Sequence, residues 1–287
     1  MARPQPSNAD QLDLRAGQSV ELLKELHILT RDARINQDSR RKLKQVYHLF
    51  QFIEPLLQRL RVQAQESGDD WCAADHGAGK SYLGFILYDL FVRHAADGHI
   101  YGIETRPELV ERSRELAQRF GFGRMGFLNL SVAQATQDSA LPERVGLVTA
   151  LHACDTATDD AIEFGLLKQA QFMVLVPCCQ AELAAALRQN KALMLARSPL
   201  AELWRRPLHT RELGSQVTNV LRCLYLEAMG YQVTVTELVG WEHSMKNELI
   251  LAEYTGQKRH SAGQRLRQIL EELGLPDHAT RRFPRLS

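Results

Sequence analysis

The chain lacks the features that mark a secreted or membrane protein. It has five cysteines in 287 residues, an odd number that does not suit a disulfide framework. No apolar run approaches the length of a membrane span. The segment from Met1 to Asp10 is polar and contains proline, without the apolar core of a signal peptide. We therefore expect a protein of the reducing cytoplasm.

The chain also lacks a net charge of either sign. It carries 35 lysine and arginine residues against 34 aspartate and glutamate residues, a formal charge of +1. This balance excludes a global field that would attract nucleic acid or a membrane surface, although a local basic surface is compatible with it. The hydrophobic fraction of 45% and the charged fraction of 24% are typical of a soluble globular protein. The length allows one large domain with appendages.

The stretch from Trp71 to Ser81 organises the rest of the chain. It is typical of a short buried strand, a glycine-rich turn and the start of a helix. Its small residues allow a backbone to come close to a ligand. Such a unit offers backbone N–H groups and the positive end of a helix. A nucleotide-like ligand is therefore predicted at this loop.

Strands and helices alternate after this loop. Further strands are predicted at 99–104, 125–130, 145–151, 172–176, 231–239 and 248–254. Thr105 is expected to cap the helix after the second strand, with Glu108 in the capping-box position. The alternation indicates βαβ units and a mostly parallel sheet, and the short link between the last two strands favours antiparallel pairing. We predict an α/β, doubly wound, Rossmann-like sheet of seven strands.

A helical extension is predicted before the sheet. Apolar residues between Leu43 and Leu60 recur at three- and four-residue steps, and Pro55 should kink or restart this helix. The predicted organisation is a peripheral segment at 1–18, the extension at 19–66, the main domain at 67–255 and a basic tail at 256–287. One amphipathic helix is expected in the tail, around 266–273.

Two of three candidate ligands fit the loop poorly. Gly79-Lys80-Ser81 matches the end of a phosphate-binding P-loop, but Ala74 stands where its first glycine belongs. Asp75 would also bring a carboxylate against the phosphates. Gly77 and Gly79 match part of a dinucleotide motif, in which Tyr82 replaces the third glycine.

S-adenosylmethionine is the third candidate, and an acid at the loop suits it because it has no phosphates. Asp75 can meet its sulfonium and amino-acid end. Glu104, which ends the next predicted strand, can accept hydrogen bonds from the two ribose hydroxyls. The antiparallel pair of strands near the C-terminus also fits this type of site.

Four motifs together resemble the Rossmann-like methyltransferase-domain family, over roughly residues 40–255. That family includes the methyltransferase-like 25 proteins, the rRNA-adenine-dimethylase-domain-containing proteins and the glutathione S-transferase C-terminal-domain-containing protein. The motifs are Asp-x-Gly-Ala-Gly-Lys at 75–80, Leu-His-Ala-Cys-Asp at 151–155, Pro-Cys-Cys at 177–179 and Glu-His-x-x-Lys-Asn at 242–247. The resemblance implies a methyltransferase that uses S-adenosylmethionine, and the family's naming points to RNA as acceptor. The Asn-Pro-Pro-Tyr motif of base N-methylation is absent after the fourth strand.

The predicted site residues follow the predicted strands. The cofactor ligands are expected to be Asp75, Gly77, Gly79, Lys80, Glu104, Ser131, Val132 and His152. Lys80 either pairs with the cofactor's carboxylate or is solvated. Methyl transfer needs positioning and, for a poor nucleophile, removal of a proton, so His152 is a candidate base and Asp155 a candidate acceptor anchor. Alternatively, Asp155 caps the next helix and His152 is a buried core residue.

Other candidate groups have less specific patterns. Cys178 is a candidate nucleophile towards a pyrimidine ring, although Cys178 and Cys179 also suit a tight turn after Pro177. Adjacent cysteines are not typical of structural zinc sites, and no metal is expected. The predicted acceptor-side residues are Glu242, His243, Lys246 and Asn247.

RNA is the expected partner, and no membrane partner is expected. The basic segments 188–211, which contains Trp204, and 256–285 can follow a phosphate backbone or can be solvated faces. Two further functions stay open. One is methylation of a protein or a small molecule. The other is a non-catalytic module that binds RNA or a ribosomal partner.

Overall fold

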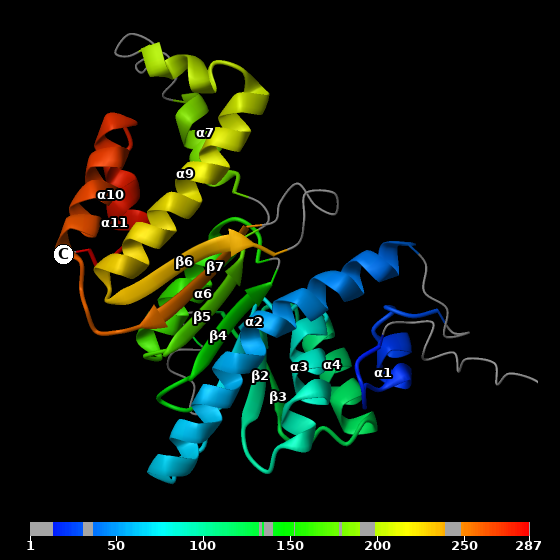
Figure 1. Cartoon of the computed structure of the whole chain (residues 1–287). Helices are drawn as coiled ribbons and strands as arrows, with labels where there is room; N and C mark the ends of the chain where they lie inside the picture. Colours follow the sequence, from blue (N-terminus) through cyan, green and yellow to red (C-terminus); the bar gives the residue numbers. More distant parts are fainter. Residues whose placement is uncertain are drawn as a thin grey trace, which may run out of the picture. The chain divides into compact units, whose positions relative to one another are not determined.

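The computed structural model describes residues 14–30, 37–131, 134, 140–151, 153–177, 180–189, 199–238 and 248–286. The chain forms two compact units, the first of Met1–Ser131 with Leu238–Met245 and the second of Val132–Glu237 with Lys246–Ser287. The strand order is β3-β2-β1-β4-β5-β7-β6 in a seven-stranded sheet, which confirms the predicted α/β fold (Figure 1). The proposed domain boundaries at 18, 66 and 255 stay a prediction.

Three parallel strands form the sheet of the first unit. They are β1 (Cys72–His76), β2 (His99–Glu104) and β3 (Met125–Asn129). Every residue of β1 is buried, as expected for a parallel strand covered on both faces. The register pairs Asp75 with Gly102 and Glu104 with Asn129. Because the strands run in the same direction, both acids lie at the carboxyl edge of this sheet.

The predicted helical extension consists of two helices in the first unit, α1 (Val20–Glu25) and α2 (Gln37–Ser67). A restart at Pro55 is wrong, since α2 continues through it. An interior proline costs about 3 kcal/mol. Phe50, Ile53 and Leu57 are nearly inaccessible to solvent. Each such side chain contributes about 1.5–3 kcal/mol on burial, so the buried stripe outweighs the lost hydrogen bond.

The remaining helices of the first unit are α3 (Tyr82–Leu90), the short 3-10 helix η1 (Val92–His94) and α4 (Pro107–Arg119). The prediction that Thr105 caps α4 is wrong, because Arg106 occupies the N-cap position. The Glu104 carboxylate accepts the backbone N–H groups of Thr105 and Arg106 at 2.9 and 3.1 Å. The acid that ends β2 therefore accepts the Thr105 N–H, which the predicted capping box assigned to Glu108.

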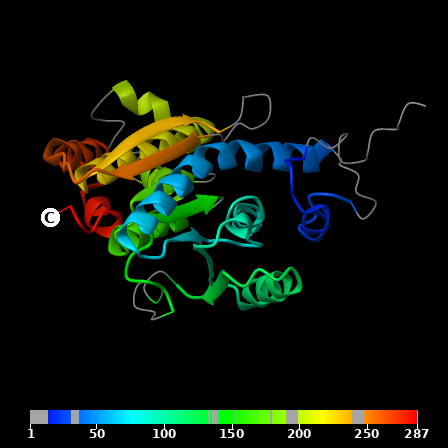
Figure 2. The ribbon, with the colours of Figure 1, turned by 60° about the horizontal axis from the view of Figure 1, so that its bottom comes forward.

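Four strands form the sheet of the second unit. β4 (Leu147–Leu151) and β5 (Phe172–Val176) are parallel. β7 (Glu248–Tyr254) is antiparallel to β5, and β6 (Tyr231–Glu237) is antiparallel to β7. The predicted antiparallel pairing of the last two strands is thereby confirmed, and Figure 2 shows β6 and β7 side by side.

The helices of the second unit are α6 (Thr156–Leu167), α7 (Glu182–Gln189), η2 (Pro199–Trp204), α9 (Pro207–Ala228), α10 (His260–Glu272) and α11 (Pro276–Arg282). The basic tail holds two helices rather than the single one predicted. Leu266 and Leu270 of α10 are buried, and α10 packs against α9 (Figure 1). The second helix, α11, escaped prediction because it is short and mostly polar.

Candidate active site

The glycine loop of the first unit is a tight turn over the end of β2. Gly77 and Gly79 have φ angles of 66° and 58°, in the left-handed region that a side chain rarely adopts. The Ala78 N–H donates to the Ile103 carbonyl at 3.1 Å, and the Gly79 N–H donates to Glu104 Oε2 at 2.8 Å. The loop therefore directs a backbone amide to the acid that ends β2.

Glu104 is the most heavily hydrogen-bonded acid of this loop region. Its side chain is 7% exposed. The Arg106 guanidinium donates to both carboxylate oxygens, from Nε to Oε1 at 3.1 Å and from Nη2 to Oε2 at 3.0 Å. Burial raises the pKa of Glu104, but the hydrogen bonds from Arg106 and Gly79 outweigh burial and bring the pKa down to about 2. Glu104 is therefore a carboxylate at neutral pH.

Asp75 and His76, at the end of β1, are both buried. Burial lowers the pKa of His76 to about 4, against an opposing effect of the Glu104 charge, so its imidazole is neutral at pH 7. Ser81 is 1% exposed, and its hydroxyl has no hydrogen-bond partner among the described residues. A Cβ atom on Gly84 would lie 2.6 Å from that hydroxyl, which is therefore packed against α3. In a P-loop the hydroxyl would instead bind Mg²⁺, so its burial argues against that alternative.

The other predicted cofactor residues of this unit lie around the same edge. Lys80 is exposed and lines a hollow of about 20 Å³ together with Glu25. Asn129 donates from Nδ2 to the Glu104 carbonyl at 3.0 Å and so joins the ends of β3 and β2. Ser131 is exposed at the end of the same segment. The cofactor roles of Lys80 and Ser131 stay predictions.

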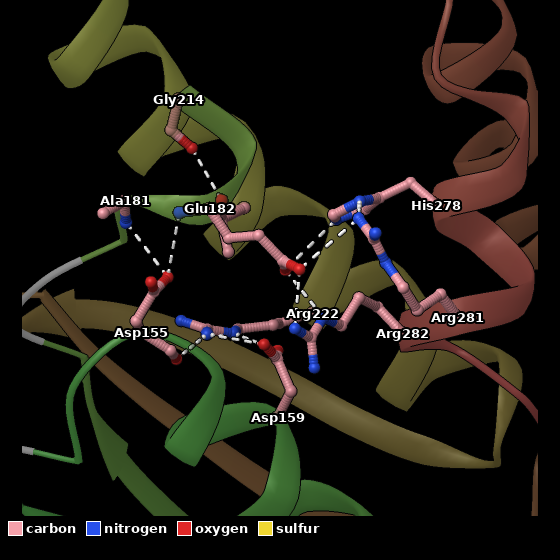
Figure 3. A network of polar contacts seen from close by, with 10 residues as sticks. Asp155, Asp159, Ala181, Glu182, Gly214, Arg222, His278, Arg281 and Arg282 are labelled. Atoms are coloured by element: carbon pink, nitrogen blue, oxygen red, sulfur yellow. Dashed lines mark hydrogen bonds and ion pairs between the residues drawn. The ribbon is translucent and has the colours of Figure 1, made fainter. Parts of the chain in front are cut away.

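Asp155 lies just beyond β4, in the second unit. Its φ of 52° and ψ of −120° are unusual for a residue other than glycine. Its carboxylate Oδ1 accepts the N–H groups of Ala181 and Glu182 at 3.0 and 3.2 Å, where α7 begins (Figure 3). A negative side chain is favourable at a helix N-terminus. Asp155 occupies the N-cap position of α6, as the alternative interpretation predicted, but its side chain gives α6 no hydrogen bond and serves the start of α7 instead.

A fully buried arginine joins β4, α6 and α9. Arg222 donates to both oxygens of Asp159, from Nε at 2.6 Å and from Nη2 at 3.1 Å, and Nη2 also donates to the Asp155 carbonyl at 2.7 Å (Figure 3). Its Nη1 donates to Asn219 Oδ1 at 3.1 Å, and Asn219 in turn donates to Glu248 at 2.7 Å. A buried charge needs such partners. Through its hydrogen bond to the Asp155 carbonyl, Arg222 supports the unusual backbone conformation of Asp155.

Sequence reasoning missed most of this network. Asp159 and Arg222 were not among the predicted site residues. Arg222 is 63 residues away from Asp159 in the chain. The one sequence signal was an arginine between apolar residues, Val220-Leu221-Arg222-Cys223-Leu224, in the segment that forms α9. A charged residue on an apolar stretch indicates a buried ion pair, although its partner cannot be identified from sequence.

A second ion-pair cluster fixes the C-terminal helix α11 to α7. Arg282 donates to both oxygens of Glu182 at 2.6 Å, and Arg281 lies 3.4 Å from the same carboxylate (Figure 3). Arg285 pairs with Glu163 at 3.0 Å. These arginines of the predicted RNA-binding tail are therefore neutralised by acids of the same unit.

Several predicted site residues lie outside the described residues. They are Val132, His152, Cys178, Cys179, Glu242, His243, Lys246 and Asn247. In the described parts of the chain, no group of three histidine, cysteine or acidic side chains can hold a metal ion. No described helix is long and apolar enough to cross a membrane.

Comparison with known proteins decides the family. A family model described as a methyltransferase domain matches residues 41–186, more than half of the chain. The chain belongs to this methyltransferase-domain family. The protein is therefore an enzyme that transfers a methyl group, and its cofactor is S-adenosylmethionine, as the sequence predicted. No curated protein matches the sequence.

Solved methyltransferase structures resemble the chain at low sequence identity. Magnesium protoporphyrin IX methyltransferase (ChlM) from Synechocystis PCC 6803 is 13% identical with a TM-score of 0.44, over 83% of this chain and 96% of that chain. TrmK from M. capricolum is 11% identical with a TM-score of 0.39, over 67% of this chain and 65% of that one. The N-terminal domain of human METTL16 is 8% identical with a TM-score of 0.42, over 72% and 69%. The family assignment rests on the matched sequence rather than on these structures.

The residues of the methyltransferase fit its cofactor in chemistry. The ribose of S-adenosylmethionine offers two hydroxyl donors, and Glu104 is an ionised carboxylate at the carboxyl edge of the sheet. Gly79 leaves room for a ligand against the loop backbone, since a Cβ on it would meet only Arg106, at 3.8 Å. The Arg106 guanidinium donates to both carboxylate oxygens of Glu104, so a ribose that binds Glu104 would compete with it.

Proposed function

We propose that this methyltransferase acts on RNA. The observation that carries the proposal is a set of exposed cations on the helical segment between β5 and β6. This segment begins at α7, next to the carboxyl end of β4. Arg188, Arg206 and His209 are exposed, and no carboxylate lies within 4.0 Å of them among the described residues. Cations of this kind bind the phosphates of a nucleic-acid backbone and position the nucleic acid without reading its base sequence.

The side chains around these cations suit the same partner. Leu203 and Leu208, on η2 and α9, are 51% and 57% exposed. Apolar side chains can pack against the faces of unpaired bases while neighbouring cations hold the phosphates. Arg205 and Arg211 pair with the neighbouring Glu202 and Glu212 and contribute less net charge. The basic tail contributes less than the sequence suggested, since its arginines pair with Glu182 and Glu163.

The chain's own residues have distinct tasks in this proposal. Bound S-adenosylmethionine supplies an electrophilic methyl group. Glu104 accepts the ribose hydroxyls, Asp75 meets the amino-acid end, and the Gly77 and Gly79 backbone approaches the cofactor closely. Lys80 pairs with the cofactor carboxylate. Ser131, Val132 and His152 complete the cofactor site.

The acceptor side is proposed to lie at the end of β4. His152 orients the acceptor or takes its proton, and Asp155 positions the segment around α7 through its hydrogen bonds to Ala181 and Glu182. In this proposal Cys178 and the loop residues Glu242, His243, Lys246 and Asn247 act on the acceptor. The buried Arg222, which is paired with Asp159, donates to the Asp155 carbonyl and keeps Asp155 in position, as methyl transfer requires of a positioning residue.

The test compares RNA nucleosides, proteins and small metabolites by mass spectrometry in a strain without the protein and in its parent. We expect one methylated nucleoside to disappear and to return when the wild-type chain is restored, but not with Glu104→Ala. Glu108→Ala is the matched control, since Glu108 is an exposed acid in the first turn of α4. Loss of a methyl group from a protein or metabolite alone would contradict RNA as acceptor. Unchanged methylation everywhere would favour a non-catalytic module.

A further inference from the structure

A second cavity lies in the second unit, at the end of the sheet opposite Asp155. It has a volume of about 550 Å³. It is lined by residues that precede β4 and β5, begin β6 and end β7, among them Gly146, Gln171, Tyr231 and Tyr254. β4 starts at this cavity and spans about 13 Å to its carboxyl end. The cavity is therefore separate from the groups placed around Asp155.

The walls of the cavity are cationic. Arg144, Lys258 and Arg285 line it, and none of its described lining residues is acidic. Arg285 shares its charge with Glu163 at 3.0 Å. Lys258 is exposed and has no carboxylate within 4.0 Å in the described part of the chain. Arg144 and Lys258 line the hollow beside the paired Arg285, so cationic side chains outnumber acids around it, which favours an anionic ligand.

An aromatic pair forms one wall. Tyr254 is 50% exposed, and its ring centroid lies 5.2 Å from that of Tyr231. Tyr231 is fixed in turn, because its hydroxyl donates to the Ala170 carbonyl at 2.6 Å. The Tyr231 ring therefore supports the Tyr254 ring from one side, and the half-exposed Tyr254 is accessible to a ligand. A tyrosine ring beside arginine and lysine suits a flat aromatic group that carries a phosphate.

The loop that carries Lys258 is held in place before any ligand binds. The N–H groups of Thr255 and Gly256 both donate to the Gly230 carbonyl, at 3.0 and 3.1 Å, and the Lys258 N–H donates to the Gly256 carbonyl at 3.1 Å. Gly256 has a φ of 74°, which this turn requires. Because the loop is already ordered, little of the free energy of ligand binding is lost in ordering it.

We propose that this cavity binds a nucleotide, with its phosphate on Arg144, Lys258 and Arg285 and its base on Tyr254. The volume lies within the range of small-molecule sites. The nucleotide is either a free molecule or one unit of a single-stranded RNA, since both present the same phosphate and base. The proposal goes beyond the RNA acceptor and does not depend on it, because a free nucleotide would use the same groups.

The test measures binding of adenosine 5′-monophosphate by calorimetry and of a fluorescent ten-nucleotide single-stranded RNA by anisotropy, both with the full-length protein. We expect Tyr254→Leu to weaken binding about tenfold, and Tyr254→Phe to bind like the wild type because it keeps the ring. Lys258→Ala should weaken binding about fivefold and lower the salt dependence of RNA binding by about one phosphate contact. Arg265→Ala is the matched control, since Arg265 is an exposed cation on α10 outside the cavity.

The outcomes distinguish a site for a free nucleotide from a site for a nucleotide within an RNA chain, and show whether the proposal is wrong. Matching losses with the monophosphate and the RNA indicate a site for any nucleotide, whereas losses with the RNA alone indicate a site for a nucleotide within a chain. Absence of binding by both probes at millimolar concentration would overturn the proposal. So would binding that Tyr254→Leu and Lys258→Ala leave unchanged. Affinity for S-adenosylhomocysteine should stay as in the wild type, which keeps this test distinct from that of the RNA acceptor.

Discussion

The pairing of Arg106 with Glu104 predicts that a single substitution tightens cofactor binding. Arg106 occupies both carboxylate oxygens, from Nε at 3.1 Å and from Nη2 at 3.0 Å. Its side chain is 59% exposed, whereas that of Glu104 is 7% exposed. The ribose hydroxyls therefore compete with an arginine that can swing into solvent.

The magnitude follows from this exposure. Ion pairs with an exposed partner contribute about 0.2–1 kcal/mol, because water screens the charges and the long side chain must be ordered. Displacing Arg106 costs the cofactor the same amount. Arg106→Met removes this competitor and keeps the apolar stem, so the Kd for S-adenosylhomocysteine should fall by up to about fivefold.

Isothermal titration calorimetry at pH 7 with S-adenosylhomocysteine measures this change. Arg119→Met is the matched control, since the Arg119 side chain is as exposed as that of Arg106 and pairs with Glu25 at the other end of α4. We expect the control to bind like the wild type. Weaker binding by Arg106→Met would refute the reasoning, because it would mean that Arg106 holds the cofactor rather than competing with it. An unchanged Kd would mean that the ribose does not use these oxygens.

Three other predictions concern stability and turnover. Arg222→Met should lower the free energy of unfolding by about 3–5 kcal/mol in urea, because it leaves Asp159 charged and buried, and Asp159→Leu added to it should recover most of the loss. His76, with a folded pKa of about 4 against 6.5 in the unfolded chain, should make that free energy fall by about 3 kcal/mol between pH 6.5 and 4, since the unfolded chain binds the proton first. His152→Ala and Asp155→Asn should lower methyl transfer at saturating cofactor by about tenfold or more, with cofactor affinity unchanged.

Each of these has a clear opposite. A double Arg222→Met, Asp159→Leu variant no more stable than Arg222→Met alone would show that the loss comes from packing rather than from an unpaired charge. His76→Gln should flatten the acid limb of the stability curve, and an identical limb would assign it to other groups. Full turnover of both site variants would remove His152 and Asp155 from the mechanism.

The local pattern of residues was enough to predict the sheet. Alternating and continuous apolar runs bounded by glycine and polar residues mark strands, and all seven predicted strands are present. The helices between the strands indicate a parallel order, so the sequence alone predicts that Asp75 and Glu104 lie at the same, carboxyl edge of the sheet. Helix ends were less predictable. At Thr105, the backbone N–H donates to the neighbouring Glu104 rather than to Glu108 of the predicted capping box. At Pro55, the burial of apolar side chains outweighs the cost of a proline inside a helix.

The sequence by itself therefore determined the fold class, the glycine loop, the two acids of the cofactor edge and, through its motifs, the methyltransferase family. Only the tertiary structure decided which charges meet. Asp159 and Arg222 are 63 residues apart, and Glu182 and Arg282 are 100 residues apart. Whether such side chains pair depends on how helices pack and rotate against the sheet, which no short stretch of sequence specifies. The cationic cavity beside Tyr254 arises for the same reason, from segments that are brought together only by folding.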